Sequence, residues 1–418
     1  MPPARPTTNQ PPPSASAGLC PATVPGALFD HSAGIPDGLY AHLRERHPVY
    51  LDAELEVWVV SRYADIDLVL RDTTGAFTNA QGYTPLQRLC PQAQAVLTQI
   101  GWVPVLSSTD PPAHTRFRRI TNAVWPTTPH RLAAHNPAIT HAVTSCAENF
   151  AARPGRHGDL VTHYAQPATM AALADLIGLP SSARQTVGTR AEALTALVFG
   201  RLTSDQQLTA AEQLRDLWHD CAALTADRLR EPRDDLLSAW LRHPDADGPL
   251  TAEEAASTLM EVLITGAEII PRLLTLTCHR LLTAGALADL DGNENGCAQA
   301  VEDTLRHDPP LIGWQRATTR EVDLSGIRIP AGARLLLLLG SAARDPLAPT
   351  SNASALAFGA GMHYCPGAAF TRHFTAQALA ALARACPHLV LDTAVGCDPN
   401  TWPPNAVLRG PHLLPVTW

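Results

Sequence analysis

Apolar residues recur every three to four positions along most of the chain, which is the spacing of helices that bury one face. The pattern is mostly helical over residues 134–241, where proline-containing breaks interrupt it. Residues 251–282 are apolar on nearly every side, and Thr251 and Glu254 form a capping box at their start, so we predict one long buried helix. A further helix is predicted over residues 368–385.

A few short stretches have the pattern of strands. Residues 49–51 and 57–60 are rich in β-branched and aromatic side chains and are separated by a polar turn. Residues 322–332 alternate and turn as a hairpin does, and residues 335–339 and 413–416 are apolar enough for further strands. The predicted fold class is therefore mainly α with small β-regions.

The chain divides into a tail and one domain. Residues 1–18 are rich in Pro and Ser and predict a disordered tail, because such a segment buries too little apolar surface to fold. Residues 19–418 are expected to form a single domain. With 45% hydrophobic residues in a chain of 418, there is ample material for a large core.

Composition argues against several classes of function. A formal net charge of −8 does not suit a nucleic-acid-binding surface. The nine cysteines show no C-x-x-C spacing, so we expect neither a disulfide scaffold nor a zinc site, and a cytoplasmic location is favoured. Residues 1–17 lack the apolar core of a signal peptide, and no apolar run is long enough to span a membrane.

A decapeptide near the C-terminus, Phe358-Gly-Ala-Gly-Met-His-Tyr-Cys-Pro-Gly367, carries the strongest chemical pattern. Cys365 is placed just before a predicted helix, where free backbone N–H groups and the helix dipole favour a thiolate. A thiolate is a good axial ligand for a soft, redox-active centre such as haem iron. Gly359 and Gly361 would let the backbone pass close to a flat cofactor. The alternative is that Cys365 is an ordinary buried small residue.

A second segment, residues 110–119, begins with Asp-Pro-Pro, which fixes a turn and starts a helix. His114 and Arg118 are then four residues apart on one helix face, and two donors on one face suit an anion such as a carboxylate. The alternative is a basic surface helix, which we expect to apply to Arg116 and Arg119. These two arginines are also candidates to face an acidic electron-donor protein.

Both segments resemble motifs of the cytochrome P-450 family, the haem-thiolate monooxygenases, in its soluble bacterial form. The decapeptide has every fixed position of the family pattern F-G-x-G-x-[H/R]-x-C-x-G, and residues 110–118 match D-P-P-x-H-x-x-x-R. The resemblance covers about residues 20–418 and implies the cytochrome P-450 fold, with haem b (iron protoporphyrin IX) as cofactor.

The resemblance also implies which residues hold the haem. Cys365 would be the axial ligand of the iron. The other cofactor-binding residues would be His114, Arg118, Arg316 and His363 at the propionates, and Phe358, Gly359 and Gly367 in the cysteine loop.

The oxygen-binding segment of the family, [A/G]-G-x-[D/E]-T-T, is matched only in part by residues 265–270. Gly266 and Glu268 agree, and with Ile269 they are the candidate catalytic positions. Ile269 stands where the family has a threonine whose hydroxyl helps to deliver protons, and isoleucine forms no side-chain hydrogen bonds. Glu268 could relay protons or pair with a nearby arginine, and Pro271 predicts a kink.

A structural ion pair of the family is also altered. Residues 301–306 resemble its E-x-x-R helix, but in register the acid is Asp303 rather than Glu302, so we expect a buried pair between Asp303 and Arg306. The family's third partner is a later arginine, and residues 347–357 contain none. The segment before the cysteine loop is therefore expected to be shortened.

By the same resemblance, several segments should surround the substrate. Residues 75–106 would lie over it, although an ordinary packed loop is an equal alternative, and residues 194–202 would form a mobile lid. Residues expected near the substrate are Leu311, Ile312, Trp314 and 402–406.

The implied function is the oxidation of a small organic molecule, as a natural-product tailoring step in a monomeric enzyme, with O₂ and electrons from a ferredoxin system. Because Ile269 replaces the threonine, oxidative ring closure or aryl coupling of an aromatic or cyclodipeptide-type substrate is an alternative to hydroxylation. Further alternatives are a peroxide-driven haem enzyme, a non-catalytic haem-binding protein, and a helical protein whose cysteine is only structural.

Overall fold

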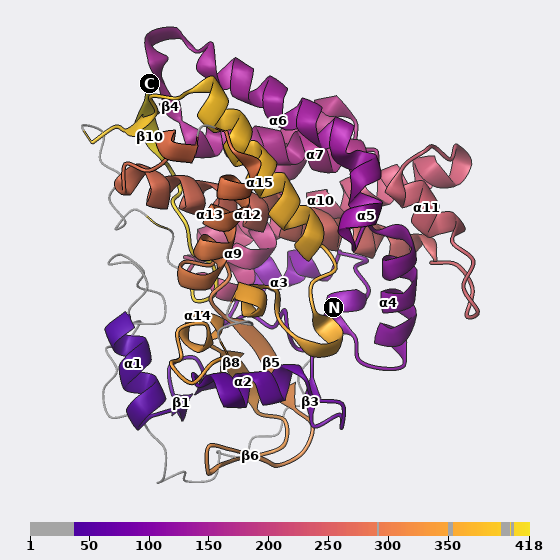
Figure 1. Cartoon of the computed structure of the whole chain (residues 1–418). Coiled ribbons are helices and arrows are strands. Elements are labelled where there is room, and N and C mark those ends of the chain that lie inside the picture. Colours follow the sequence, from indigo (N-terminus) through magenta and orange to yellow (C-terminus); the bar gives the residue numbers. More distant parts are fainter. Residues whose placement is uncertain (1–36, 291, 350–353, 394–401, 403–404) are drawn as a thin grey trace.

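The computed structural model describes residues 37–290, 292–349, 354–393, 402 and 405–418, and the tail expected at residues 1–18 lies outside them. Helices form most of the molecule, with the five-stranded and the two-stranded sheet at its lower end and a three-stranded sheet at the upper left (Figure 1). The predicted class, mainly α with small β-regions, is confirmed.

The described α-helices are α1 (Asp37–Arg46), α2 (Tyr63–Leu70), α3 (Pro91–Leu97), α4 (Ala113–Val124), α5 (Pro129–Leu132), α6 (Asn136–Ala151), α7 (Gln166–Ile177), α8 (Arg184–Ala191), α9 (Ala193–Phe199), α10 (Ser204–Arg230), α11 (Leu236–Arg242), α12 (Ala252–Thr283), α13 (Glu294–His307), α14 (Leu339–Ala342) and α15 (Ala368–Ala385). The described strands are β1 (Val49–Asp52), β2 (Val57–Val60), β3 (Phe77–Thr78), β4 (His157–Asp159), β5 (Trp314–Thr318), β6 (Val322–Leu324), β7 (Ile327–Ile329), β8 (Arg334–Leu337), β9 (Val390–Leu391) and β10 (Pro415–Thr417).

The largest sheet has the strand order β1-β2-β8-β5-β3, in which β8 pairs parallel with β2 and antiparallel with β5. Val57–Val60 and the three leucines of β8 are buried, as expected for strands that are apolar throughout rather than alternating. Arg316 of β5 lies opposite Leu335 of β8 in this sheet. The backbone that carries Arg316 is therefore fixed by a buried neighbour strand.

The long helix α12 is the centre of the fold. It spans nearly the predicted residues, and the capping box between Thr251 and Glu254 is present. It contacts α7, α8, α10, α13 and α15, and it lies in their midst in Figure 1. Its helical backbone continues through Pro271, so the kink expected there does not break the helix.

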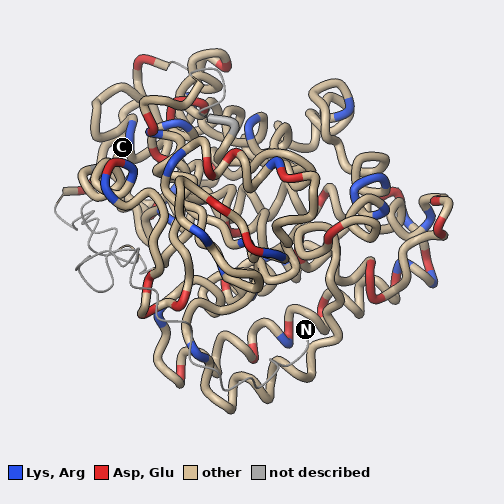
Figure 2. Tube along the Cα trace, turned by 90° about the horizontal axis from the view of Figure 1, so that it is seen from below, with Lys and Arg blue, Asp and Glu red and all other residues tan. Residues whose placement is uncertain are grey.

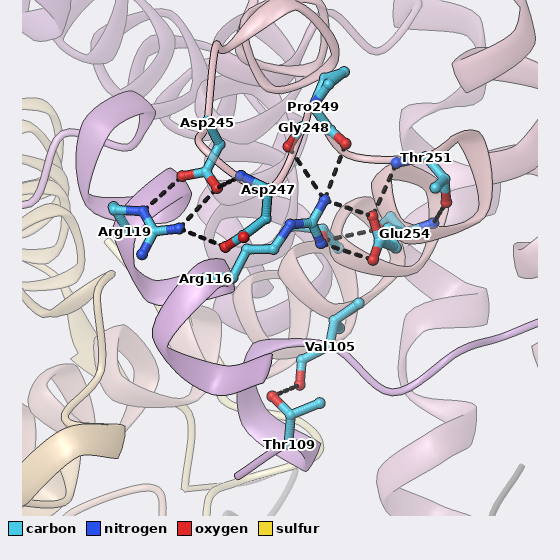
Figure 3. A network of polar contacts seen from close by, with 11 residues as sticks. Val105, Thr109, Arg116, Arg119, Asp245, Asp247, Gly248, Pro249, Thr251 and Glu254 are labelled. Atoms are coloured by element: carbon cyan, nitrogen blue, oxygen red, sulfur yellow. Dashed lines mark hydrogen bonds and ion pairs between the residues drawn. The ribbon is translucent and has the colours of Figure 1, made fainter. Parts of the chain in front are cut away.

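Two arginines tie α4 to the region where α12 begins (Figure 3). Arg116 donates to both carboxylate oxygens of Glu254, at 2.8 and 3.1 Å, and Arg119 donates to Asp245 at 2.6 and 2.7 Å and to Asp247 at 3.1 Å. The Arg119 side chain is 47% exposed, as a surface helix predicts, but that of Arg116 is only 16% exposed. Both charges meet carboxylates of their own chain, which weakens the suggestion that they face an electron donor.

Charges elsewhere on the described chain are also mixed in sign. Figure 2 shows basic and acidic positions interspersed along the trace. Several arginines pair with a nearby carboxylate, for example Arg71 with Asp67 and Arg184 with Asp175. Among the described helices, none is both long enough and apolar enough to cross a membrane.

Candidate functional site

Nearly all of the site residues predicted from the sequence line one cavity. It lies between the cysteine loop, α12, α4 and β5, and all but two of the predicted site residues line it. Those that do are Gly266, Ile269, Arg118, Arg316, His363, Phe358, Gly359, Cys365 and Gly367. The two exceptions are His114, which lies behind His363, and Glu268.

The cysteine loop is held by its own backbone. The N–H of Cys365 donates to the carbonyl oxygen of Phe358 at 3.0 Å, and α15 begins three residues later, at Ala368, as predicted. Gly361 has a φ of +67°, and a Cβ there would lie 2.3 Å from the carbonyl oxygen of Leu70. The close approach that the structure shows is thus to the end of α2, and Gly361 does not line the cavity, whereas Gly359 does.

Two opposing effects act on the pKa of the Cys365 thiol. Burial raises the pKa of its thiol, although the N–H of Gly367 and the positive charges of Arg118 and Arg372 act to lower it. Desolvation therefore outweighs the helix N-terminus in the protein alone. A cation bound to the sulfur would be needed to hold it as a thiolate.

Four basic side chains lie close to the cysteine loop, and three of them line the cavity. The rings of His114 and His363 lie 4.2 Å apart, and Asn79 contacts Nδ1 of His363 at 3.2 Å. Arg118 donates to the carbonyl oxygen of Met362 at 2.7 Å. Arg316, from β5, donates to the carbonyl oxygen of Gln315 at 2.8 Å and is 5% exposed.

Two of these four groups, Arg118 and Arg316, carry positive charge without an ion-pair partner in the described part of the chain. Burial lowers the pKa of Arg316 to about 10, that of His114 to about 4 and that of His363 to about 3, so both rings are neutral near pH 7. Nε2 of His114 and Nε of Arg118 are buried without a hydrogen-bond partner. Such donors fit an anionic group inside the cavity.

The wall formed by α12 is apolar where the family motif has its threonine. Ile269 lines the cavity, and so does Thr265 one turn earlier. The Thr265 hydroxyl donates to the backbone oxygen of Glu261 at 2.8 Å, so it is already used within the helix.

Glu268 lies on another face of α12 and is 4% exposed. Arg272 donates to its Oε1 at 3.2 Å, and the Thr195 hydroxyl donates to its Oε2. Burial raises the pKa of Glu268 to about 7, although Arg272 and Thr195 act to lower it. Of the two roles considered for Glu268, this geometry matches the ion pair with arginine, and the proton relay stays a prediction.

The expected ion pair between Asp303 and Arg306 is wrong. Asp303 is exposed and accepts a hydrogen bond from Gln299 at 2.9 Å. Glu302 instead pairs with Arg372 of α15 at 2.6 Å. Successive helical residues are turned by about 100°, so when Glu302 faces α15 its neighbour must face solvent. Residues 350–353, part of the segment expected to be shortened, lie outside the described residues.

The expected substrate region is only partly correct. Tyr83 and Leu106 of residues 75–106 line the cavity, as do Leu311 and Trp314. Ile312 is buried outside the cavity, and Trp402 packs on Arg409 instead, with 4.5 Å between the guanidinium and the ring. The described part of the 194–202 segment does not line the cavity either.

The one carboxylate among the described residues that line the cavity was missed at the sequence level. Glu261 lines it and lies four residues before Thr265 and eight before Ile269. That spacing places the three side chains on one helix face, so the sequence contained the information. It was overlooked because no motif includes Glu261.

The chain was compared with known proteins, and no family model matches it. It is 30% identical over 408 residues to the cytochrome P-450 monooxygenase PikC of Streptomyces venezuelae, covering 94% of this chain and 93% of the relative. It is 28% identical over 394 residues to 6-deoxyerythronolide B hydroxylase of Saccharopolyspora erythraea, covering 90% and 94%. The solved structure of cytochrome P-450 CREJ in complex with (4-ethylphenyl) dihydrogen phosphate is similar, with a TM-score of 0.83, 28% identity, and 92% and 97% coverage.

The raised pKa of Glu268 predicts a pH dependence of stability. A carboxyl group whose pKa is higher in the folded chain stabilises it at low pH, and that contribution is lost as pH rises through about 7. The free energy of unfolding of the wild type, minus that of Glu268→Gln, should therefore fall between pH 5 and pH 8. Urea unfolding of both proteins at each pH measures this difference. A constant or rising difference would contradict the prediction.

Proposed function

Because this chain belongs to the cytochrome P-450 family of haem-containing monooxygenases, we propose that it performs a natural-product tailoring oxidation with O₂ and electrons from a ferredoxin system. The relatives support a tailoring role, since they include a mycinamicin hydroxylase/epoxidase and an erythromycin hydroxylase. The substrate proposed is a small organic molecule that fits beside Ile269 and Trp314 in the cavity.

The assignment of residues rests on one observation. Cys365 shares a cavity with Arg118 and Arg316, and the buried Nε of Arg118 has no hydrogen-bond partner. Cys365 is proposed as the iron ligand, and His114, Arg118, Arg316 and His363 as donors to the two haem carboxylates. Free donor atoms on His114 and Arg118 support this role.

The remaining loop residues are proposed to shape the cofactor site. The guanidinium of Arg372 lies 4.3 Å from the ring of Phe358, which fixes one wall of the cavity. Gly367, where a Cβ would lie 3.6 Å from Sγ of Cys365, keeps the approach to the sulfur open, and Gly359 lines the cavity with a φ of +72°. A thiolate-bound haem, once in place, supplies the electron-rich iron that favours O–O cleavage.

The residues around Ile269 determine where protons can come from. Ile269 offers no hydroxyl, and the hydroxyl of Thr265 is bonded within α12. We therefore propose that the substrate or an ordered water supplies the protons. A substrate that takes part in this way is compatible with ring closure or aryl coupling as well as with hydroxylation.

A peroxide-driven reaction is the second candidate, and the apolar side chain of Ile269 favours it. Hydrogen peroxide brings its own protons and electrons, so such an enzyme would not need the hydroxyl. Steady turnover with hydrogen peroxide and no reductase would support this candidate over the ferredoxin-dependent one.

Replacing the proposed iron ligand tests the assignment. We expect Cys365→Ala to abolish the thiolate-type carbon-monoxide difference spectrum, because no other described cysteine lines the cavity. The matched control is Cys146→Ala, on α6, which should keep the spectrum of the wild type. An unchanged spectrum in Cys365→Ala would overturn the assignment.

Restoring the hydroxyl tests the proton source. If O₂ activation is limited by protons at this position, Ile269→Thr should raise the fraction of consumed electrons that appears in product. Ile269→Val, which has the shape of threonine without the hydroxyl, controls for the smaller side chain. Equal coupling in both variants would mean that the protons come from elsewhere.

A further inference from the structure

Glu261 is a carboxylate inside the cavity that no part of the haem assignment uses. It lies on the same face of α12 as Thr265 and Ile269, two turns before the latter. The Tyr83 hydroxyl lies 3.5 Å from its Oε1 and 2.9 Å from the hydroxyl of Ser107. Tyr83 and Ser107 also line the cavity, so three polar groups meet at one place on its wall.

Among the described residues, Glu261 has no cation of its own, although it is buried, whereas three other acidic residues of α12 and α13 each pair with an arginine. Glu254 and Glu268 of α12 pair with arginines at 2.8 and 3.2 Å, and Glu302 of α13 does so at 2.6 Å. Within the described chain no arginine or histidine lies at ion-pair distance from Glu261. A buried carboxylate without a partner is costly, so a position that retains one calls for an explanation.

Binding of haem would not remove this imbalance. Arg118 and Arg316 are the arginines among the described residues that line the cavity, and the haem brings two carboxylates. The rings of His114 and His363 lie 4.2 Å apart and can offer further hydrogen bonds to the propionates. The two arginines balance the two propionates, and the negative charge of Glu261 is left over.

The surroundings of Glu261 suit a cation. Tyr83 packs edge-on against Trp314, with 5.8 Å between ring centroids, and lies 5.3 Å from Trp102. Aromatic rings attract cations through their faces. Burial raises the pKa of Glu261 to about 7, whereas Ser107, Tyr83 and the charge of Arg118 favour its ionised form. A cation beside it would add to that preference.

We propose that Glu261, with Tyr83 and Ser107, binds a positively charged nitrogen of the substrate and so orients the rest of the molecule toward Cys365. The substrate class is then an amine with an apolar body, because apolar side chains such as Val262, Ile269 and Leu311 also line the cavity. This inference rests on the proposed function, since it requires haem and substrate to share the cavity.

A matched pair of probes tests the charge preference. The cation is (4-phenylbutyl)trimethylammonium, whose quaternary nitrogen cannot coordinate iron, and the neutral probe is (5,5-dimethylhexyl)benzene, its carbon isostere. Chain lengths one carbon shorter and longer are included for both. Dissociation constants are measured by equilibrium dialysis on the haem-loaded wild type, on Glu261→Gln and on Glu253→Gln. Glu253 is exposed at the start of the same helix and serves as the control.

Glu261→Gln should weaken binding of the cation about tenfold or more and leave the neutral probe nearly unchanged, because it removes one buried charge and little volume. Glu253→Gln should change neither. The inference is overturned if no cation binds the wild type, if Glu261→Gln leaves its affinity unchanged, or if both probes weaken equally.

The carbon-monoxide difference spectrum of each protein is recorded alongside. If the spectrum is of the normal thiolate type but Glu261→Gln does not selectively weaken binding of the cation, only the role of Glu261 is contradicted. Absence of that spectrum in the wild type defeats the proposed function itself.

Discussion

The rest of this structure depends on one constraint: buried positive charge lies in the same cavity as a cysteine. Arg118 and Arg316 are desolvated and have no carboxylate partner among the described residues. An arrangement of this kind is costly unless anions enter the cavity. The two carboxylates of a haem would offset that cost, while its iron would hold Cys365 as a thiolate against the burial that now raises the pKa of the thiol.

The surrounding fold can be understood as support for this arrangement. Arg116 fixes α4, and with it His114 and Arg118, to the start of α12. Pairing of β5 with the buried strand β8 holds Arg316. Gly361 allows the cysteine loop to press against the end of α2. Elements far apart in the sequence therefore hold one cavity in shape.

Features that a short motif determines could be predicted from the sequence, whereas features that depend on helical register or on no motif could not. The structure brings the cysteine loop and Arg118 to one cavity and His114 against His363, because short motifs determine both their backbone and their chemistry, and their roles toward haem stay predictions. The pairing of Asp303 was wrong, because one residue of helical register decides which side chain faces α15. Glu261 was missed because no motif includes it, although its spacing from Thr265 and Ile269 places it on the same helix face.

One face of α12 then links the two unusual features of the site. Ile269 removes a proton donor near the reacting end, and Glu261 adds a charge two turns away. With both features, the substrate itself would supply groups that the protein lacks. It would bring protons near Ile269 and a cation beside Glu261. Such a site is expected to be selective in what it oxidises.

Haem affinity tests the central electrostatic account most directly. The apoprotein can be titrated with haem and with haem dimethyl ester, whose carboxylates carry no charge, in the wild type and in the Arg118→Gln/Arg316→Gln double variant. If the arginines bind the carboxylates, esterification should weaken binding about tenfold or more in the wild type and much less in the variant. Equal affinity of the wild type for the two forms of haem would contradict the account.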